Sequence, residues 1–278
     1  MGLKISHNLL ALQAHRHLKA TQDSLEKVVQ KLSSGLRINT AADDAAGLAI
    51  SERMRAQISS TEQATRNANY ALNLLQTAEG SLNQISGILI RMRELAVEAS
   101  AATMTDEDRS YAQQEFDTLR NEITRIAQVT EYNAQKLIDG SLSSSGVRFQ
   151  IDINNVQGED WYRVTFNDMT ASGLQLHNVD LSTVSGAQSA IAIIDSAIDL
   201  KDTERIKIGS YIDRLTSTIA NLQVGYENLV ASESQIRDAD IALEMAEFVR
   251  NNILMKAGVA MVAQANMLPE TVASLLKG

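Results

Sequence analysis

Apolar residues recur every three or four positions through most of this chain, and this spacing limits the fold more than any other feature. Residues at this spacing lie on one face of an α-helix, so a sustained run forms a packing seam. The longest unbroken run contains Ala64, Ala68, Ala71, Leu75, Ala78, Leu82, Ile85, Leu89, Met92, Ala96 and Ala99. It predicts a long helix that packs lengthwise against other helices.

A second helix is expected after the break at TMTDEDR. Thr105 followed by Asp108 is the pattern of a capping box, with acidic residues in the first turn. The apolar positions that follow are Ala112, Phe116, Leu119, Ile123 and Ile126. A short break between two such runs predicts an antiparallel helical hairpin.

A third run keeps the same phase from Ile191 to Leu243. If it were continuous, its roughly 53 positions would span about 80 Å at 1.5 Å per residue. Polar residues interrupt its seam and predict breaks or looser contacts. They are Lys201, Arg205, Glu233 and Asp240.

Strands are predicted only in the middle of the chain. Apolar and polar residues alternate in VRFQIDI and again in WYRVTF, on either side of NNVQGED. Alternation around a turn-rich break predicts a β-hairpin at about 147–166. Its apolar residues are Val147, Phe149, Ile151, Ile153, Tyr162, Val164 and Phe166.

Composition and charge agree with a helical protein and exclude several classes of function. The 278 residues include no Cys, which excludes disulfides and thiolate metal sites. One Pro and 4% aromatic residues favour long helices with thin interfaces. The net charge of −9 argues against nucleic acid or an anionic membrane as partner. It is divided unevenly, since residues 1–40 carry +4 and 41–235 carry −12.

The two ends of the chain are patterned for burial. Residues 253–265 are apolar nearly all round a helix, but they are too few for a membrane span of about 20 residues. Such a helix must be buried on every face, and one N-terminal helix cannot cover it. Contacts with other copies of the chain would, which predicts a polymer. The N-terminus has no apolar run or cleavage site typical of a secretory signal peptide. The expected assembly core is Leu9, Leu18, Leu25, Leu32, Leu254, Val259, Ala260, Ala263 and Leu275.

No catalytic, cofactor or metal site is predicted. Asp43 and Asp44 are neighbours that do not face each other on a helix, so helix caps or solvated charges are favoured over an acid–base or metal pair. His15 and His17 cannot share a helix face. A helical di-metal enzyme needs Glu-x-x-His pairs, and the sequence contains none.

Five segments resemble bacterial flagellins. LSSGLRINTAADDAAGLAISERM, and then ATRNANYALNLLQTAEGSLNQI with IRMRELAVEA, resemble the N-terminal flagellin signature. ENLVASESQIRDADIALEMAEF and GVAMVAQANMLPETVASLL resemble the C-terminal one. The resemblance covers roughly the first 140 and the last 90 residues.

The resemblance implies a mainly α fold, an elongated coiled-coil-like helical bundle with one β-hairpin. Residues 1–43 and 236–278 would pair as an inner layer, and 44–235 would form an outer rod layer. The variable outer domains of larger flagellins would be missing, giving a minimal, two-layer form. Gly35, Arg37, Asn39, Asp43 and Asp44 would then form a joint that sets the angle between the layers.

The implied function is mechanical: a structural subunit polymerises into the bacterial flagellar filament for motility. The implied partners are other copies, an export chaperone, the filament cap and hook-junction proteins. The filament would be extracellular, with a periplasmic flagellum left open. The alternative is a hook–filament junction protein with flagellin-like ends. Arg91, Leu95 and Glu115 match a surface read by Toll-like receptor 5, and Arg91 and Leu95 are expected to lie off the seam.

Overall fold

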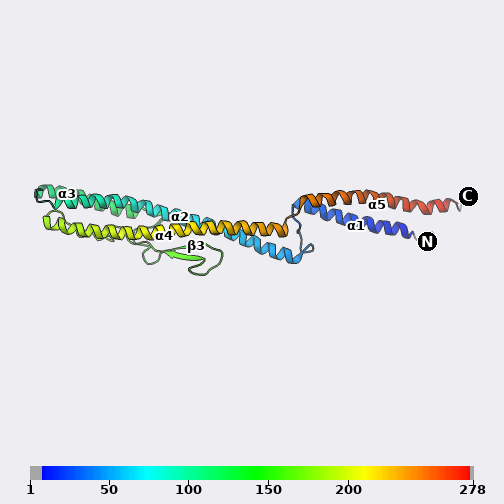
Figure 1. Cartoon of the computed structure of the whole chain (residues 1–278), viewed down its shortest axis with the longest axis horizontal. Helices are drawn as coiled ribbons and strands as arrows, with labels where there is room; N and C mark the ends of the chain where they lie inside the picture. The colour runs from blue at the N-terminus through cyan, green and yellow to red at the C-terminus, as the bar shows by residue number, and fades with distance from the viewer. Residues whose placement is uncertain (1–7, 276–278) are drawn as a thin grey trace. The chain divides into compact units, whose positions relative to one another are not determined.

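The computed structural model describes residues 8–275 and their side chains up to residue 267 (Figure 1). Its elements are α1 (Leu9–Ser34), α2 (Ala45–Ala99), α3 (Asp106–Val129), β1 (Glu131–Tyr132), β2 (Gln135–Lys136), β3 (Val147–Gln150), β4 (Trp161–Val164), the 3₁₀ helix η1 (Leu176–Asn178), α4 (Val184–Arg237) and α5 (Ile241–Leu275). The chain divides into a terminal unit, Met1–Gln57 with Asn228–Gly278, and a central unit, Ile58–Glu227. The domain boundaries predicted at 43/44 and 235/236 stay a prediction.

The core of the central unit lies along one face of α2. All eleven residues of the predicted seam from Ala64 to Ala99 are buried, and nine of them are fully inaccessible to solvent. All of them except Ala64 belong to one apolar cluster with residues of α3, α4 and the segment around the β3–β4 hairpin, including Phe116, Phe166 and Ile194. The seam and the helices it predicts are therefore confirmed.

The turn between α2 and α3 is held from both sides. The capping box is present. The Thr105 hydroxyl accepts a hydrogen bond from the backbone N–H of Asp108 at 3.2 Å, and the Asp108 carboxylate accepts one from the backbone N–H of Thr105. The buried guanidinium of Arg109 donates to the carbonyls of Ala99, Ala101 and Met104 at 2.8–3.1 Å. The sequence predicted the cap. It did not predict that Arg109 would donate hydrogen bonds to the backbone carbonyls at and after the end of α2.

The predicted β-hairpin is confirmed, with β3 and β4 antiparallel and Val147 paired with Val164. The pairing ends at Gln150, and Ile153 is exposed, because the chain turns away at NNVQGED. A smaller antiparallel hairpin, β1–β2, was not predicted. Its turn residues Asn133 and Ala134 both have positive φ, a conformation Ala rarely adopts, so the sequence carries no strong turn signal there.

Helix α4 is continuous from Val184 to Arg237, so the breaks suggested for Lys201, Arg205 and Glu233 were wrong. Lys201 is only 3% exposed, and its ammonium donates to the Ser86 hydroxyl at 2.9 Å and to Asp202. These partners satisfy the charge and allow the helix to pass through. The fourth of these polar residues is Asp240. The break predicted there is present, since α4 ends at Arg237 and α5 begins at Ile241.

Candidate assembly site

Helices α1 and α5 pack against each other in the terminal unit, as predicted (Figure 1). Gly258 allows close approach, since a β-carbon there would lie 3.1 Å from a Leu18 methyl group. The Lys31 ammonium and the Glu244 carboxylate are 2.8 Å apart, and the Asn8 amide donates to the Ala265 carbonyl. The two helices therefore share one seam with polar ties along it.

Outside that seam, large apolar side chains of both helices remain exposed. On α5 the exposed fractions are 62% for Ile253, 50% for Leu254, 55% for Val259 and 63% for Met261. On α1, Leu9 is 58% exposed. A single partner helix covers only one face of α5, so the apolar residues on its other faces are left in contact with water.

The predicted assembly core separates into two groups. Leu18, Leu25 and Leu32 are half-buried within one chain, and Leu18 lies beside Gly258 of α5. Leu275 lies outside the described side chains. The residues that remain exposed are Leu9, Leu254, Val259, Ala260 and Ala263. Only this second group is available to another copy of the chain, and its burial in a polymer stays a prediction.

The connector between α1 and α2 is tied to the connector between α4 and α5. Gly35 ends α1 in the left-handed region, with φ of 72°, and its N–H donates to the Lys31 carbonyl at 2.8 Å. The Gly35 carbonyl accepts from the N–H of Ala239, and the Arg37 N–H donates to the Arg237 carbonyl at 2.7 Å. The two connectors are thus bound backbone to backbone.

Side chains reinforce this pairing. The Arg37 guanidinium donates to the carbonyls of Gln235 and Ile236, where α4 ends with unsatisfied acceptors. The Arg237 guanidinium donates to the Glu52 carboxylate at 2.6 Å, which holds the pKa of Glu52 below its usual value. Arg37 and Arg237 therefore join the last turn of α4 to the first part of the chain.

Of the two adjacent acidic residues, Asp44 caps the start of α2, as predicted, whereas Asp43 holds a turn of the connector. The Asp43 carboxylate accepts from the N–H groups of Asn39 and Thr40 and from the Thr40 hydroxyl, at 2.9–3.2 Å. The hydrogen bonds from Thr40, and then that from Asn39, lower the pKa of Asp43. Asp44 begins α2, and its carboxylate accepts from the Gly47 N–H at 2.9 Å. A β-carbon at Gly47 would overlap the Asp44 carboxylate, so this turn is specific to glycine.

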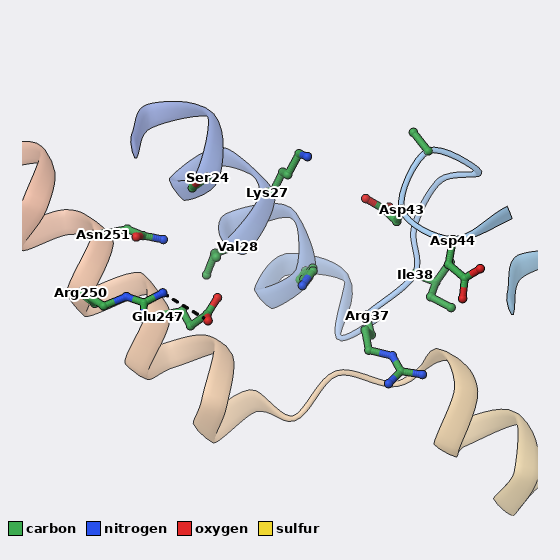
Figure 2. A pocket seen from close by; sticks show the side chains of 12 residues that line it. Ser24, Lys27, Val28, Arg37, Ile38, Asp43, Asp44, Glu247, Arg250 and Asn251 are labelled. Atoms are coloured by element: carbon green, nitrogen blue, oxygen red, sulfur yellow. Dashed lines mark hydrogen bonds and ion pairs between the residues drawn. The ribbon is translucent and has the colours of Figure 1, made fainter. Parts of the chain in front are cut away.

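A hollow of about 550 Å³ lies between α1, the connector from α1 to α2, and α5 (Figure 2). Its lining includes four basic and three acidic side chains, and Arg250 is paired with Glu247 at 3.4 Å. Within residues 8–275, no three His, Cys, Asp or Glu side chains gather as metal ligands. The hollow has mixed charge, and two of its carboxylates, Asp43 and Asp44, already bind backbone N–H groups.

The proposed receptor surface is only partly exposed. Arg91 and Glu115 are exposed, and their side chains meet at 2.9 Å across α2 and α3. Leu95 is 2% exposed, so the expectation that it lies off the buried face was wrong. Helix α2 packs against more than one helix, which buries a wider stripe than its principal seam.

Two family models match the chain. The model described as the bacterial flagellin N-terminal helical region covers residues 5–143, and that of the C-terminal helical region covers 191–276. The chain belongs to the bacterial flagellin family. The segment between the two matches, residues 144–190, contains the β3–β4 hairpin, η1 and the start of α4.

Relatives in this family match nearly end to end. A flagellin of Halalkalibacterium halodurans is 45% identical over 98% of this chain and 99% of its own length. A flagellar filament 33 kDa core protein of Treponema phagedenis is 37% identical over 98% and 99%. A solved hook-associated flagellar protein from Vibrio parahaemolyticus aligns with a TM-score of 0.60 over 70% of this chain and all of its own, at 14% identity, which concerns the fold alone. The chain is therefore a minimal member of the flagellin family.

No helix among residues 8–275 offers an apolar stretch that could cross a bilayer. This holds for α5 as well, the most apolar helix of the chain.

Proposed function

We propose that this chain is the structural subunit of a bacterial flagellar filament, in which many copies polymerise without chemistry. The observation that carries the proposal is the exposed apolar surface of α5, where Ile253, Leu254, Val259 and Met261 are each at least half exposed. Membership of the flagellin family and the relative named as a filament core protein support it.

The physical basis of assembly is burial of this surface by neighbouring copies. Covering each half-exposed aliphatic side chain is worth on the order of 1 kcal/mol, so several of them per subunit offset the cost of association. Contacts between different surfaces of successive copies propagate into an open helical polymer instead of a closed dimer.

The direct test is assembly of the purified chain, followed by negative-stain electron microscopy. We expect long filaments after addition of a polymerising salt. Expression in a bacterium that lacks its own flagellin should then restore swimming. A chain that stays soluble, or that forms only short caps on existing hooks, would contradict the proposal. Short caps would point to a hook–filament junction protein.

We further propose that the paired connectors act as a joint. Gly35, Arg37, Asn39, Asp43 and Asp44 fix the end of α1 and the start of α2 through the hydrogen bonds described above. A rigid joint would give every subunit in the polymer the same angle between its inner and outer layers.

The partners that we propose beyond other copies follow from the family alone. They are an export chaperone, the filament cap and hook-junction proteins. The proposed location is an extracellular filament, with a periplasmic one as the alternative. Immunogold labelling of intact cells, compared with cells whose outer membrane is permeabilised, separates the two locations.

Recognition by Toll-like receptor 5 is proposed for the face formed by Arg91 and Glu115. The soluble subunit should activate receptor-expressing cells, and Arg91→Ala should reduce that signal. Arg93→Ala is a matched control, because Arg93 pairs with Asp195 and has similar exposure. Equal signals from both variants would remove Arg91 from the proposed surface.

A further inference from the structure

The methionines of this chain range from fully buried to more than half exposed, with Met54, Met104 and Met255 in between. Of nine in the sequence, four lie on α5, where Met245, Met261 and Met267 are 45%, 63% and 53% exposed. In the central unit, Met92 and Met169 are 0% and 1% exposed. A thioether in water reacts readily with oxidants, whereas one in a packed core does not.

The three exposed methionines lie on two faces of α5. At about 100° per residue, Met267 lies about 40° from Met245 around the helix, and Met261 lies about 160° from Met245. A neighbouring helix that covers either of these two faces meets at least one of them. Other large apolar side chains exposed on the same helix include Val249, Ile253 and Val259.

We propose that Met245, Met261 and Met267 form an oxidation site that controls assembly, a proposal that rests on the proposed filament function. The oxidant is a peroxide. The sulfur lone pair attacks one peroxide oxygen, the S–O bond forms and the O–O bond breaks. The leaving hydroxide takes the remaining proton and departs as water. Sulfur is oxidised by two electrons to the sulfoxide, and the peroxide is reduced by two.

The sulfoxide changes the surface on which assembly depends. It replaces an adaptable apolar side chain with a polar one, whose S=O oxygen loses its hydration when a neighbouring subunit covers it. Because the same surface is covered at every subunit, the effect recurs along the polymer. The oxidised subunit stays folded but polymerises only at a higher concentration, and the assembled subunit is shielded from the oxidant.

The first test compares oxidation of the soluble subunit with that of filaments. Both are treated with dilute hydrogen peroxide, and sulfoxide at each methionine is measured by peptide mass spectrometry. We expect Met245, Met261 and Met267 to oxidise in the soluble subunit at least tenfold faster than Met92 and Met169, the buried controls. In filaments the rates at the three α5 methionines should fall toward those of the controls. Equal rates in subunit and filament would overturn the shielding.

The second test measures assembly after oxidation. Peroxide treatment of the soluble subunit should raise the concentration needed for filament formation at least tenfold, while its circular dichroism stays unchanged. Methionine sulfoxide reductase should restore assembly. The triple variant Met245→Leu, Met261→Leu, Met267→Leu keeps an apolar surface without the sulfur. Peroxide should therefore leave the concentration that this variant itself needs for filament formation unchanged.

The outcomes separate this inference from the filament function. Oxidised wild-type chain that polymerises like untreated chain would overturn the inference and leave the filament function standing. The same holds for a triple variant that peroxide still inhibits, since the sensitive group would then lie elsewhere. Failure of the untreated chain to polymerise would overturn both.

Discussion

The central and terminal units use the same spacing of apolar residues and reach opposite outcomes. In the central unit, Leu82 and Phe116 are fully buried because residues of α2, α3, α4 and the hairpin pack into one cluster. In the terminal unit, α1 is the helix that packs along the described part of α5, and Leu254 stays 50% exposed. The number of partner elements, and not the apolar pattern, decides whether a helix is sealed within its own chain.

This difference implies that the two units have different tasks. A unit that buries its seam internally is stable as a monomer. A unit that leaves apolar faces uncovered gains its full stability only when another molecule covers them. Variants that are matched in chemistry but placed in different units test this division.

The largest effect is expected from Ala260→Arg. Ala260 lies on an exposed face of α5, so the substitution disturbs no contact within the chain. In the polymer it would bury an unpaired charge, which costs at least several kcal/mol. Sedimentable filaments should vanish, while far-UV circular dichroism and thermal melting of the monomer stay unchanged.

Ala260→Ser is the control, since it adds a polar group of similar size without a charge and should still polymerise. Normal filaments from the arginine variant would show that this face of α5 is not buried between subunits. An unfolded variant monomer would show that the face belongs to the subunit's own core.

Truncating one leucine in each unit compares the two directly. Leu82→Ala removes a fully buried side chain and should lower the free energy of unfolding by about 2–5 kcal/mol. Leu254→Ala removes a half-exposed one and should change it by only about 0.5 kcal/mol in the monomer. Urea denaturation of the soluble chain measures both.

In the assembly assay the order of the two variants should reverse. Leu254→Ala should raise the concentration needed for filaments more than Leu82→Ala does. If Leu254→Ala destabilised the monomer as much as Leu82→Ala, the proposed division between the units would fail.

A smaller effect is expected from removing a cap in the connector. Asp44→Ala leaves the Gly47 N–H without its acceptor and should cost about 1 kcal/mol, located at the start of α2. Hydrogen exchange of the first turn of α2 should become faster, while exchange near Leu82 is unchanged. Asp44→Asn keeps an acceptor oxygen and should behave almost like the original chain. Faster exchange throughout α2 would contradict a local cap.

The smallest effect is a loss of connector order in acid. Hydrogen bonds from Thr40 and Asn39 lower the pKa of Asp43 from its usual 3.8, and the Arg237 hydrogen bond lowers that of Glu52 from 4.5. A carboxylate with a lowered folded pKa contributes stability that is present above the unfolded pKa and is lost as pH falls through the folded one. The connector should therefore loosen below about pH 4.

Exchange rates of the Asn39 and Thr40 amides, measured by NMR and corrected for intrinsic pH dependence, would report this loosening. In Asp43→Asn the acid-dependent step at these amides should shrink. An undiminished step in that variant would assign the acid response to other groups.

Local sequence determined the helices, their caps and the seam of this chain. The spacing from Ala64 to Ala99, the Thr105–Asp108 capping box and the alternation in β3 and β4 act over a few residues, where propensity and side-chain period dominate. The signatures at both ends were likewise sufficient to identify the flagellin family.

Tertiary structure decided how those local elements are used. Leu95 was expected to be accessible, but α2 packs against several elements and buries it. Lys201 was expected to mark a break or a looser contact in its helix, but it is buried in a continuous α4, and its ammonium donates a hydrogen bond to the hydroxyl of Ser86, more than a hundred residues earlier in the chain. Leu18 and Leu254 have the same apolar side chain, yet Leu18 is half-buried where α1 packs against α5 and Leu254 is exposed to water. Such outcomes depend on which distant residues come into contact, and a local pattern does not specify them.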